Sequence, residues 1–356
     1  MKKIGIMSMQ RVINYGSFMQ AYALKKTIES LGHKVEFVDY EYEKTIVEEK
    51  KKNIIEKIKK NCNVIWFFKK KSKLSKFRAF YQKECLKYLN VSEEKNYYPQ
   101  IDTLVIGSDE VFNCMQGYPV GYSRNLFGYK YDIKKISYAA SFGYTTIDML
   151  KDKKIDKEVS ELLSKFEAIS VRDSNSKEIV ENLTDFNVET NLDPVLIYDF
   201  EEEIKDIKID MKNYIIVYAY TGRLNKEEQM NIKKFAKKHN KKIVSLGFPQ
   251  EVADINIVVD PFEMLAYFKN ADFVITDTFH GTIFSAVTNT KFISLVRKSN
   301  FNKMKSLLEN LTLEERLITS LDNLEEKYKQ EINFSNANII RKEAQNKTKE
   351  YLKKYL

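Results

Sequence analysis

The chain contains only three cysteines among its 356 residues, Cys62, Cys85 and Cys114. Three scattered thiols are too few for a disulfide framework or a zinc site, so we expect a reducing compartment and no bound metal. A run of about 18 apolar residues, which a membrane-spanning helix requires, is also missing. A first strand is expected within four residues of the amino terminus, without the apolar segment of a signal peptide. These absences predict a soluble, cytoplasmic protein.

Excess positive charge is absent from most of the chain. The segment from Lys50 to Arg78 holds twelve Lys or Arg residues and one acid, Glu56, which accounts for more than the whole net charge of +9. A broad basic face, as in nucleic-acid-binding proteins, is therefore not expected. A local anionic partner is expected instead for residues 50–78.

Two series of alternating strand and helix patterns make up the rest of the chain. The first has strand patterns at residues 3–7, 34–39, 103–106, 136–140, 168–171 and 187–190, and the second at 214–220, 242–246, 256–259, 273–276 and 291–296. This alternation predicts parallel sheets with helices on their faces. We therefore predict an α/β fold with two Rossmann-like domains, residues 1–198 and 199–330, that face each other across a cleft. Residues 331–356 are expected to form a helix that crosses back to the first domain.

The basic segment belongs to a helical insert in the first domain, at about residues 44–90. Two sets of apolar residues have helical spacing: Ile54, Ile55, Ile58, Cys62 and Ile65, and then Phe77, Phe80, Tyr81 and Cys85. Between them, Trp66-Phe67-Phe68 precedes Lys69-Lys70-Lys71, a combination that suits a membrane interface. Two interpretations remain open: a helical hairpin that rests on an anionic membrane surface, or a lid on the first domain whose lysines face water.

His280 is one of only three histidines, and it lies where a strand pattern gives way to a helix pattern. In α/β proteins this is the usual place for chemistry. The first turn of the helix leaves the amides of Gly281 and Thr282 free to bind an anion, and an imidazole exchanges protons near neutral pH. We interpret His280 as a candidate acid–base residue; the alternative is a buried, hydrogen-bonded core histidine.

Cationic residues follow other strand patterns. Arg172 comes directly after residues 169–171, and a guanidinium can grip a carboxylate or phosphate with two parallel hydrogen bonds. Its alternative role is a surface ion pair with Asp173 or Glu178. Arg297 and Lys298, and also Arg223, follow strand patterns of the second domain and are further candidates for positive charge in the cleft.

Residues 277–282, Asp-Thr-Phe-His-Gly-Thr, resemble the D-S-F-H-G-T signature of the polysaccharide pyruvyl transferase family. Further blocks resemble that family in the expected order, at residues 14–17 with 20–24, 106–113, 137–143, 169–172 and 192–196, so the resemblance covers roughly residues 3 to 296. Glu110 and Phe112 depart from the family pattern, which has glutamine and tryptophan there. Acceptor preference is therefore expected to differ from that of better-known members.

The resemblance implies a GT-B-like transferase that moves the pyruvyl group of phosphoenolpyruvate onto a sugar of a cell-surface polysaccharide or lipid-linked glycan precursor. No metal or other cofactor is implied. The expected site residues are Arg172, His280 and Asp109 for catalysis; Arg172, His280, Gly281, Thr282, Arg297 and Lys298 for the donor; and Asn14, Tyr15, Gly16, Asp109 and Asn113 for the acceptor. Asp109 can equally be a turn residue bonded to its own backbone.

Two other functions remain open. One is a nucleotide-sugar-dependent GT-B glycosyltransferase, in which His280 and its helix would hold a diphosphate. The other is a non-catalytic protein that binds a glycan or a lipid carrier. The location expected from the sequence is cytoplasmic, with peripheral attachment to the inner face of the membrane if the insert binds lipid.

Overall fold

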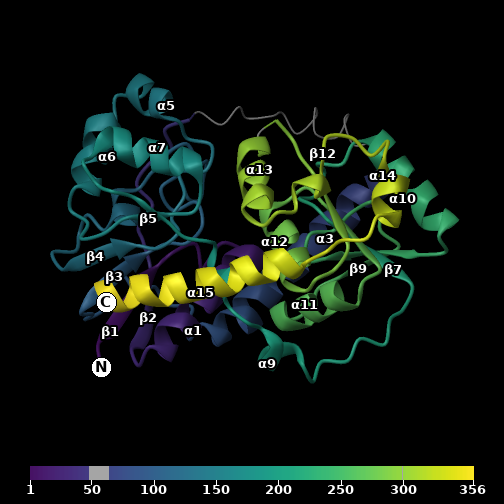
Figure 1. Cartoon of the computed structure of the whole chain (residues 1–356), viewed down its shortest axis with the longest axis horizontal. Helices are drawn as coiled ribbons and strands as arrows, with labels where there is room; N and C mark the ends of the chain where they lie inside the picture. The colour runs from purple at the N-terminus through teal and green to yellow at the C-terminus, as the bar shows by residue number, and fades with distance from the viewer. Residues whose placement is uncertain (48–63, 299) are drawn as a thin grey trace.

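The computed structural model describes residues 1–47, 64–298 and 300–356, and it has two α/β lobes (Figure 1). The first lobe has a parallel sheet of order β2-β1-β3-β4. Its strands are β1 (Lys3–Met7), β2 (Lys34–Val38), β3 (Thr103–Ile106) and β4 (Lys134–Ser137). A parallel pair, β5 (Ser170–Val171) and β6 (Glu189–Thr190), continues this sheet through isolated bridges from the β4 segment. This is the Rossmann-like arrangement that the first series of patterns predicts.

The second lobe has a parallel sheet of six strands, in the order β12-β11-β10-β7-β8-β9. Its strands are β7 (Tyr214–Tyr218), β8 (Lys242–Leu246), β9 (Ile255–Ile257), β10 (Phe273–Thr276), β11 (Phe292–Leu295) and β12 (Leu317–Ile318). The central strands β7, β10 and β11 are buried along their whole length. Continuous apolar strands of this kind are typical of parallel sheets covered on both faces.

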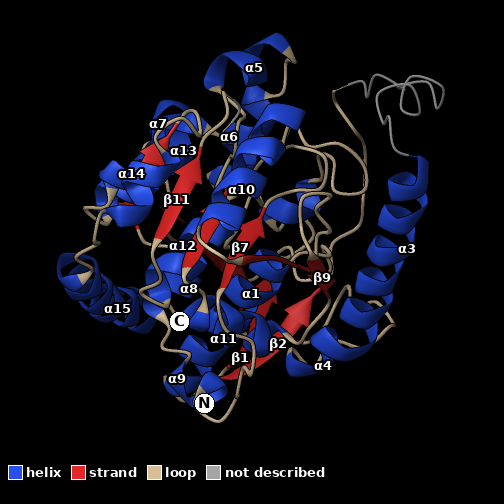
Figure 2. Cartoon of the chain, turned by 90° about the vertical axis from the view of Figure 1, so that its right-hand side faces the viewer, coloured by secondary structure: helices blue, strands red, loops and turns tan. Residues whose placement is uncertain are grey.

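Helices cover both sheets (Figure 2). In the first lobe they are α1 (Tyr15–Ser30), α3 (Val64–Phe80), a π-helical turn (Tyr81–Cys85) that leads into α4 (Leu86–Tyr88), a 3-10 turn (Arg124–Phe127), α5 (Ile147–Asp152), α6 (Asp156–Leu163), α7 (Ser174–Leu183) and α8 (Pro194–Ile197). In the second lobe they are α9 (Glu201–Ile204), α10 (Lys226–Lys238), α11 (Pro261–Asn270), α12 (Phe279–Val287), α13 (Phe301–Asn310), a 3-10 turn (Glu314–Arg316) and α14 (Leu324–Lys329).

The last helix, α15 (Ser335–Tyr355), crosses both lobes. Its carboxyl-terminal half packs on the first lobe, where the Tyr351 hydroxyl donates to the Ser137 carbonyl at 2.8 Å. The hydroxyls of Thr348 and Tyr138 also lie 2.8 Å apart in a hydrogen bond. The helix therefore ties the end of the chain to the first lobe.

Capping side chains set the helix starts that border the cleft. Thr278 caps α12, because its hydroxyl accepts from the amide of Gly281. Asn14 caps α1 in the same way by accepting from Gly16. The Ser17 side chain takes no part in this cap and is left free for another contact.

The described part of the basic insert, α3, lies along one flank of the molecule (Figure 2). Phe77 of α3 packs against Tyr15 of the first lobe and Phe248 of the second, with ring centroids 4.9 Å and 5.5 Å apart. The Lys73 ammonium donates to the Asn256 carbonyl. This arm therefore contacts both lobes and not the first alone, whereas the predicted arm with Ile54, Ile55, Ile58 and Cys62 lies outside the described residues.

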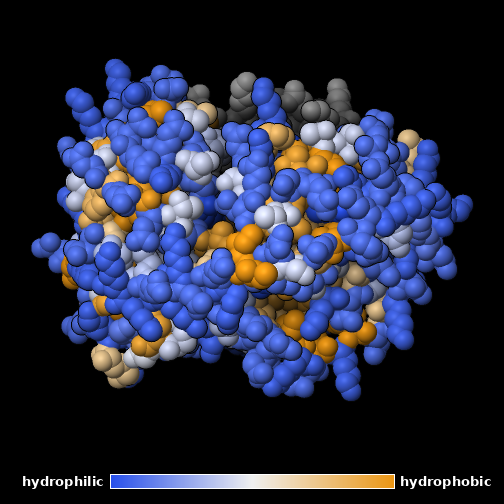
Figure 3. Space-filling view, viewed as in Figure 1, coloured by the Kyte–Doolittle hydropathy of each residue, from blue (hydrophilic) through white to orange (hydrophobic). Residues whose placement is uncertain are grey.

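The molecular surface is mostly hydrophilic and is hollowed between the lobes (Figure 3). Within the described ranges, no helix combines the length and apolar character needed to cross a membrane.

Candidate functional site

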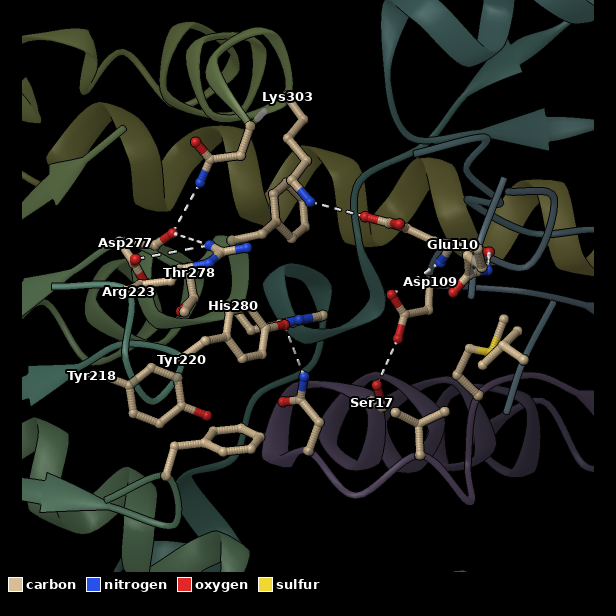
Figure 4. A pocket seen from close by; sticks show the side chains of 18 of the residues that line it. Ser17, Asp109, Glu110, Tyr218, Tyr220, Arg223, Asp277, Thr278, His280 and Lys303 are labelled. Carbon is tan, nitrogen blue, oxygen red and sulfur yellow. Dashed lines mark hydrogen bonds and ion pairs between the residues drawn. The ribbon is translucent and has the colours of Figure 1, made fainter. Parts of the chain in front are cut away.

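A cleft pocket of about 160 Å³ lies between the carboxyl ends of the two sheets (Figure 4). Ligands of open α/β sheets bind at such strand ends. The first lobe contributes residues that follow β1, β3 and β5, and the second contributes residues that follow β7, β10 and β11. The lining residues are Met9, Val12, Asn14, Ser17, Asp109, Glu110, Gln116, Val120, Arg172, Tyr218, Tyr220, Arg223, Phe248, Asp277, Thr278, Phe279, His280, Asn300 and Lys303.

A buried charge chain joins the two strongest candidates. The Nη1 atom of Arg172 donates to Oδ2 of Asp193 at 2.8 Å, and Nε2 of His280 lies 3.6 Å from the same oxygen. Burial raises the pKa of Asp193, but His280 and Arg172 outweigh this effect and hold that pKa below its usual range. Asp193 is therefore a charged link between the arginine of one lobe and the histidine of the other.

Arg172 is fixed on two further sides. Its Nη2 atom lies 3.5 Å from Oδ1 of Asp109, and its guanidinium lies over the Phe279 ring, 4.5 Å from the centroid. The Ser17 hydroxyl donates to the other oxygen of Asp109 at 2.7 Å. The structure thus brings Arg172 and Asp109 together at the pocket. The proposed ion pair with Asp173 or Glu178 is not formed.

Gly16 of α1 lies directly against the His280 ring. A Cβ atom at this position would come within 2.2 Å of Nδ1 of His280, which belongs to the other lobe. Contacts under 3.0 Å are not tolerated without movement, and Gly16 is therefore the surface on which the imidazole rests. Asn14 also links the lobes, since its amide donates to the Tyr220 hydroxyl at 3.2 Å.

We predict that Gly16→Ala lowers turnover by about a hundredfold, because an added methyl group must displace the His280 ring by roughly 1 Å. The helix itself should tolerate the change, since alanine is the better helix former by about 1 kcal/mol. The catalytic rate of the variant is the measurement, and Lys26→Ala on the same helix is the matched control. Equal rates for the two variants would show that the imidazole contact is dispensable.

Glu110 and Lys303 form an ion pair across the cleft, with Nζ and Oε1 2.8 Å apart. Burial works against ionisation of Glu110, but Lys303, together with Arg172 and Asn113, lowers its pKa to about 2. The carboxylate is therefore charged at neutral pH. The departure from glutamine at this position consequently adds a negative charge to the cleft.

Asp277 is buried beside the pocket between two arginines. Its Oδ2 atom lies 3.8 Å from Nη1 of Arg223 and 3.8 Å from Nε of Arg297, and neither carboxylate oxygen has a hydrogen-bond partner among the described residues. Burial, which the two arginines only partly offset, raises its pKa from 3.8 to about 6. Asp277 is thus a group that changes charge near the lower end of the physiological pH range.

The raised pKa of Asp277 has a consequence for stability. The folded state binds this proton more tightly than the unfolded state does, so the group's contribution to stability falls as pH rises from about 4 to about 6. Asp277→Asn removes the titration. The unfolding free energy of the variant, measured by urea denaturation, should therefore improve relative to the unmodified protein between pH 4 and pH 7. A difference that does not change with pH would contradict the assignment.

Several predicted residues lie elsewhere. The amides of Gly281 and Thr282 bond to the Oγ1 and carbonyl oxygen of Thr278, so they are used within the start of α12 and neither residue lines the pocket. The structure therefore does not bring these two amides, predicted to bind phosphate, to the cleft pocket. Space explains the glycine: a Cβ there would lie 2.2 Å from Oγ1 of Thr276.

Other predicted binding residues act as supports. Arg297 makes a two-pronged ion pair with Glu228, at 2.5 Å and 3.0 Å, and Lys298 lines a neighbouring pocket. The Tyr15 hydroxyl donates to the Val259 carbonyl, which ties α1 to the second lobe. The Asn113 amide donates to Glu110. None of these four side chains lines the cleft pocket, because each is held by a neighbour or faces away from it.

Four buried polar atoms of the pocket have no hydrogen-bond partner among the described residues: the Tyr218 hydroxyl, both carboxylate oxygens of Asp277 and Nε2 of His280. Orphaned buried polar atoms are rare in native proteins and are expected to meet a ligand. Tyr218 and Asp193 were not predicted as site residues. Asp193 lay within a quoted motif block, whereas Tyr218, inside an apolar strand, carried no signal. Within the described ranges, no group of three or more potential ligands could hold a metal ion.

Solved structures similar in fold cover the whole molecule. Arabidopsis thaliana UGT89C1 in complex with quercetin matches with a TM-score of 0.52 at 10% identity, over 99% of this chain and 99% of that one. The UDP-GlcNAc 2-epimerase of Methanocaldococcus jannaschii, in complex with UDP-GlcNAc and UDP, matches with a TM-score of 0.51 at 11% identity, over 98% and 99%. At such identities the likeness concerns the fold alone, which is the predicted GT-B-like pair of Rossmann-like domains.

No curated protein matches this chain in sequence. A family model described as polysaccharide pyruvyl transferase, however, matches residues 14–299, which include both sides of the cleft pocket. The match extends from the Asn14 cap of α1 to the strand after His280. This chain therefore belongs to the polysaccharide pyruvyl transferase family.

Proposed function

We propose that this transferase moves the pyruvyl group of phosphoenolpyruvate onto two hydroxyls of a sugar. The observation that carries the proposal is the His280–Asp193–Arg172 chain, which places an imidazole nitrogen without a hydrogen bond and a fixed guanidinium at one inter-lobe pocket. The donor is an anion that must be protonated on carbon, so its chemistry needs both groups.

Arg172, Arg223 and Lys303 supply the positive charge for the donor. Arg223 is the most accessible of them, with 37% of its side chain exposed; its Nη1 atom lies 3.8 Å from the Asp277 carboxylate and donates to the Asp277 carbonyl at 3.4 Å. Its guanidinium also lies over the Tyr220 ring, which holds it at the pocket. A carboxylate or phosphate of the donor can replace the long contacts of Arg172 and Arg223 with charge-assisted hydrogen bonds.

The proposed reaction starts with a proton from His280 to the methylene carbon of phosphoenolpyruvate, which leaves an oxocarbenium-like centre at C2. Asp193 lies 3.6 Å from Nε2 of this imidazole and orients the ring. One sugar hydroxyl then adds to C2 and loses its proton to Asp109, which Ser17 and Arg172 orient. Phosphate departs with one proton, the second hydroxyl closes the ketal and loses its proton, and the remaining proton returns to the imidazole.

The proposal is tested by donor binding and turnover. Calorimetry should show binding of phosphoenolpyruvate, and phosphate release from it should depend on an acceptor, which a glycan screen would identify. If nucleotide sugars bind and phosphoenolpyruvate does not, the GT-B glycosyltransferase alternative replaces the proposal. If a biological activity of the chain survives His280→Ala unchanged, the non-catalytic alternative replaces the proposal.

We also propose that α3 holds the enzyme at an anionic membrane surface, where a lipid-linked glycan precursor would be the acceptor. The Phe68 side chain is 66% exposed, and the exposed Lys69 and Lys71 follow it. Each lysine near an anionic leaflet contributes on the order of 1 kcal/mol. We predict that the protein floats with anionic but not neutral liposomes.

Charge reversal distinguishes this membrane contact from general charge attraction. Replacement of Lys69, Lys70, Lys71 and Lys73 by Glu should abolish flotation. The matched control replaces three exposed lysines of α10, Lys233, Lys234 and Lys237, and should leave flotation intact. Flotation that survives reversal in α3 would contradict the membrane role and favour the alternative in which this segment only covers the fold.

A further inference from the structure

A second cavity, the side pocket, adjoins the cleft pocket. It has a volume of about 280 Å³ and lies between the β4–α7 region of the first lobe and the start of α13 in the second. Its lining residues are Gly143, Tyr144, Thr146, Met149, Asp173, Ser174, Asn175, Lys298, Asn300, Phe301, Asn302 and Lys303. Asn300 and Lys303 line both cavities, so the two cavities lie next to each other and share a wall.

Exposed apolar faces gather around the side pocket. Tyr144 is 49% exposed, Met149 39% and Phe301 37%, and together they line it from both lobes. The Tyr144 hydroxyl bonds to the Met115 carbonyl, which holds the ring in place. Apolar surface that stays exposed around a polar cavity marks a binding site. Aromatic faces beside hydrogen-bonding side chains suit a sugar ring, which has apolar and hydroxylated sides.

The polar groups of the side pocket favour negative charge. Lys298 is exposed and forms no ion pair within the described ranges. The acid of this wall, Asp173, is already used, because its carboxylate accepts from the Ser141 hydroxyl at 2.6 Å and from the Ser176 amide at 2.8 Å. The first turns of α7 and α13 also line the cavity, and amides there have no acceptors within their helices.

We propose that the side pocket binds the acceptor as a sugar that carries an anionic substituent, a phosphate or a carboxylate. The ring lies against Tyr144 and Phe301, the anion lies at Lys298, and the reacting hydroxyls reach past Asn300 to Asp109. This inference rests on the proposed pyruvyl transfer. It also assigns Lys298 to acceptor binding, whereas the sequence had suggested donor binding.

Three glucose derivatives that share one ring test the inference: glucose 1-phosphate, glucuronate and methyl glucoside. Saturation-transfer NMR titrations would be run with and without saturating phosphoenolpyruvate. We expect both anionic probes to bind at least about tenfold more tightly than methyl glucoside, as one charge-assisted contact allows. Lys298→Ala should remove this preference, and Tyr144→Ala should weaken all three probes. The ratio between the two anionic probes identifies phosphate or carboxylate as the substituent.

The control variant is Lys305→Ala, which removes an exposed lysine of α13 that pairs with Glu309 and lies outside the side pocket. Equal affinity for the three probes, or an anion preference that survives Lys298→Ala, would overturn the inference. Displacement of the probes by phosphoenolpyruvate would also overturn it, because the two ligands would then share one site. If phosphoenolpyruvate itself does not bind, the proposed function fails, but the effect of Lys298→Ala on affinity for the anionic probes is still measured and tests the side pocket separately.

Discussion

His280→Ala is expected to lower turnover at least about a hundredfold, the usual scale for loss of a positioned proton-transfer group. The imidazole lies 3.6 Å from Asp193 and rests on Gly16, so no neighbour can take its place. Phosphate release from phosphoenolpyruvate in the presence of an active acceptor measures the effect. Affinity for the donor should change much less, since Arg172, Arg223 and Lys303 are also proposed donor contacts.

Two further variants make the His280 result specific. His280→Gln keeps a hydrogen-bonding side chain of similar length but cannot cycle a proton, and it should be almost as slow as the alanine variant. His239→Ala removes a histidine that pairs with Glu325 on the surface of the second lobe, and it should retain full activity. A His280→Gln enzyme with near-normal turnover would remove the proton-transfer role and leave only a structural one.

Arg172→Lys is expected to raise the KM for phosphoenolpyruvate and to lower kcat, together by at least about a hundredfold in kcat/KM. Lysine keeps the charge but lacks the planar fork that contacts Asp193 and Asp109 and that we propose also binds the donor. Steady-state kinetics with varied donor concentration separate the two parameters. An unchanged KM with lowered kcat would assign Arg172 to the reacting centre and not to donor binding.

Arg172→Ala should be worse than the lysine variant for a second reason. Its guanidinium is buried beside Asp193 and Asp109, so its loss removes the closest positive charge from the buried Asp193 carboxylate, at a cost of roughly 3–5 kcal/mol of stability. Urea denaturation of both variants would separate misfolding from lost catalysis. A folded Arg172→Lys protein with full kcat/KM would contradict the proposed role of Arg172 in donor binding, whatever the result for the alanine variant.

Motifs at strand ends were sufficient to find part of the cleft. The strand patterns predicted two parallel sheets, and in a parallel sheet the residues after the strands must gather at one edge. Asp109, Arg172 and His280 were found in this way, and the structure brings them to one pocket with Asn14. The same reasoning misplaced Arg297, which also follows a strand but turns to Glu228. The positions of strand ends in the sequence therefore predict which residues lie at the carboxyl edge of the sheet, but not the direction in which each side chain points.

The amino-acid sequence by itself determined the two α/β lobes, the family and the order of the motif blocks, because periodicity and spacing are local properties. Only the tertiary structure decided which groups meet across the cleft. Gly16 is needed for the imidazole of the other lobe, Asp193 joins Arg172 to His280, and Glu110 pairs with Lys303. These contacts join residues that are far apart in the chain. The packing of the two lobes sets their distances, and no local pattern encodes it.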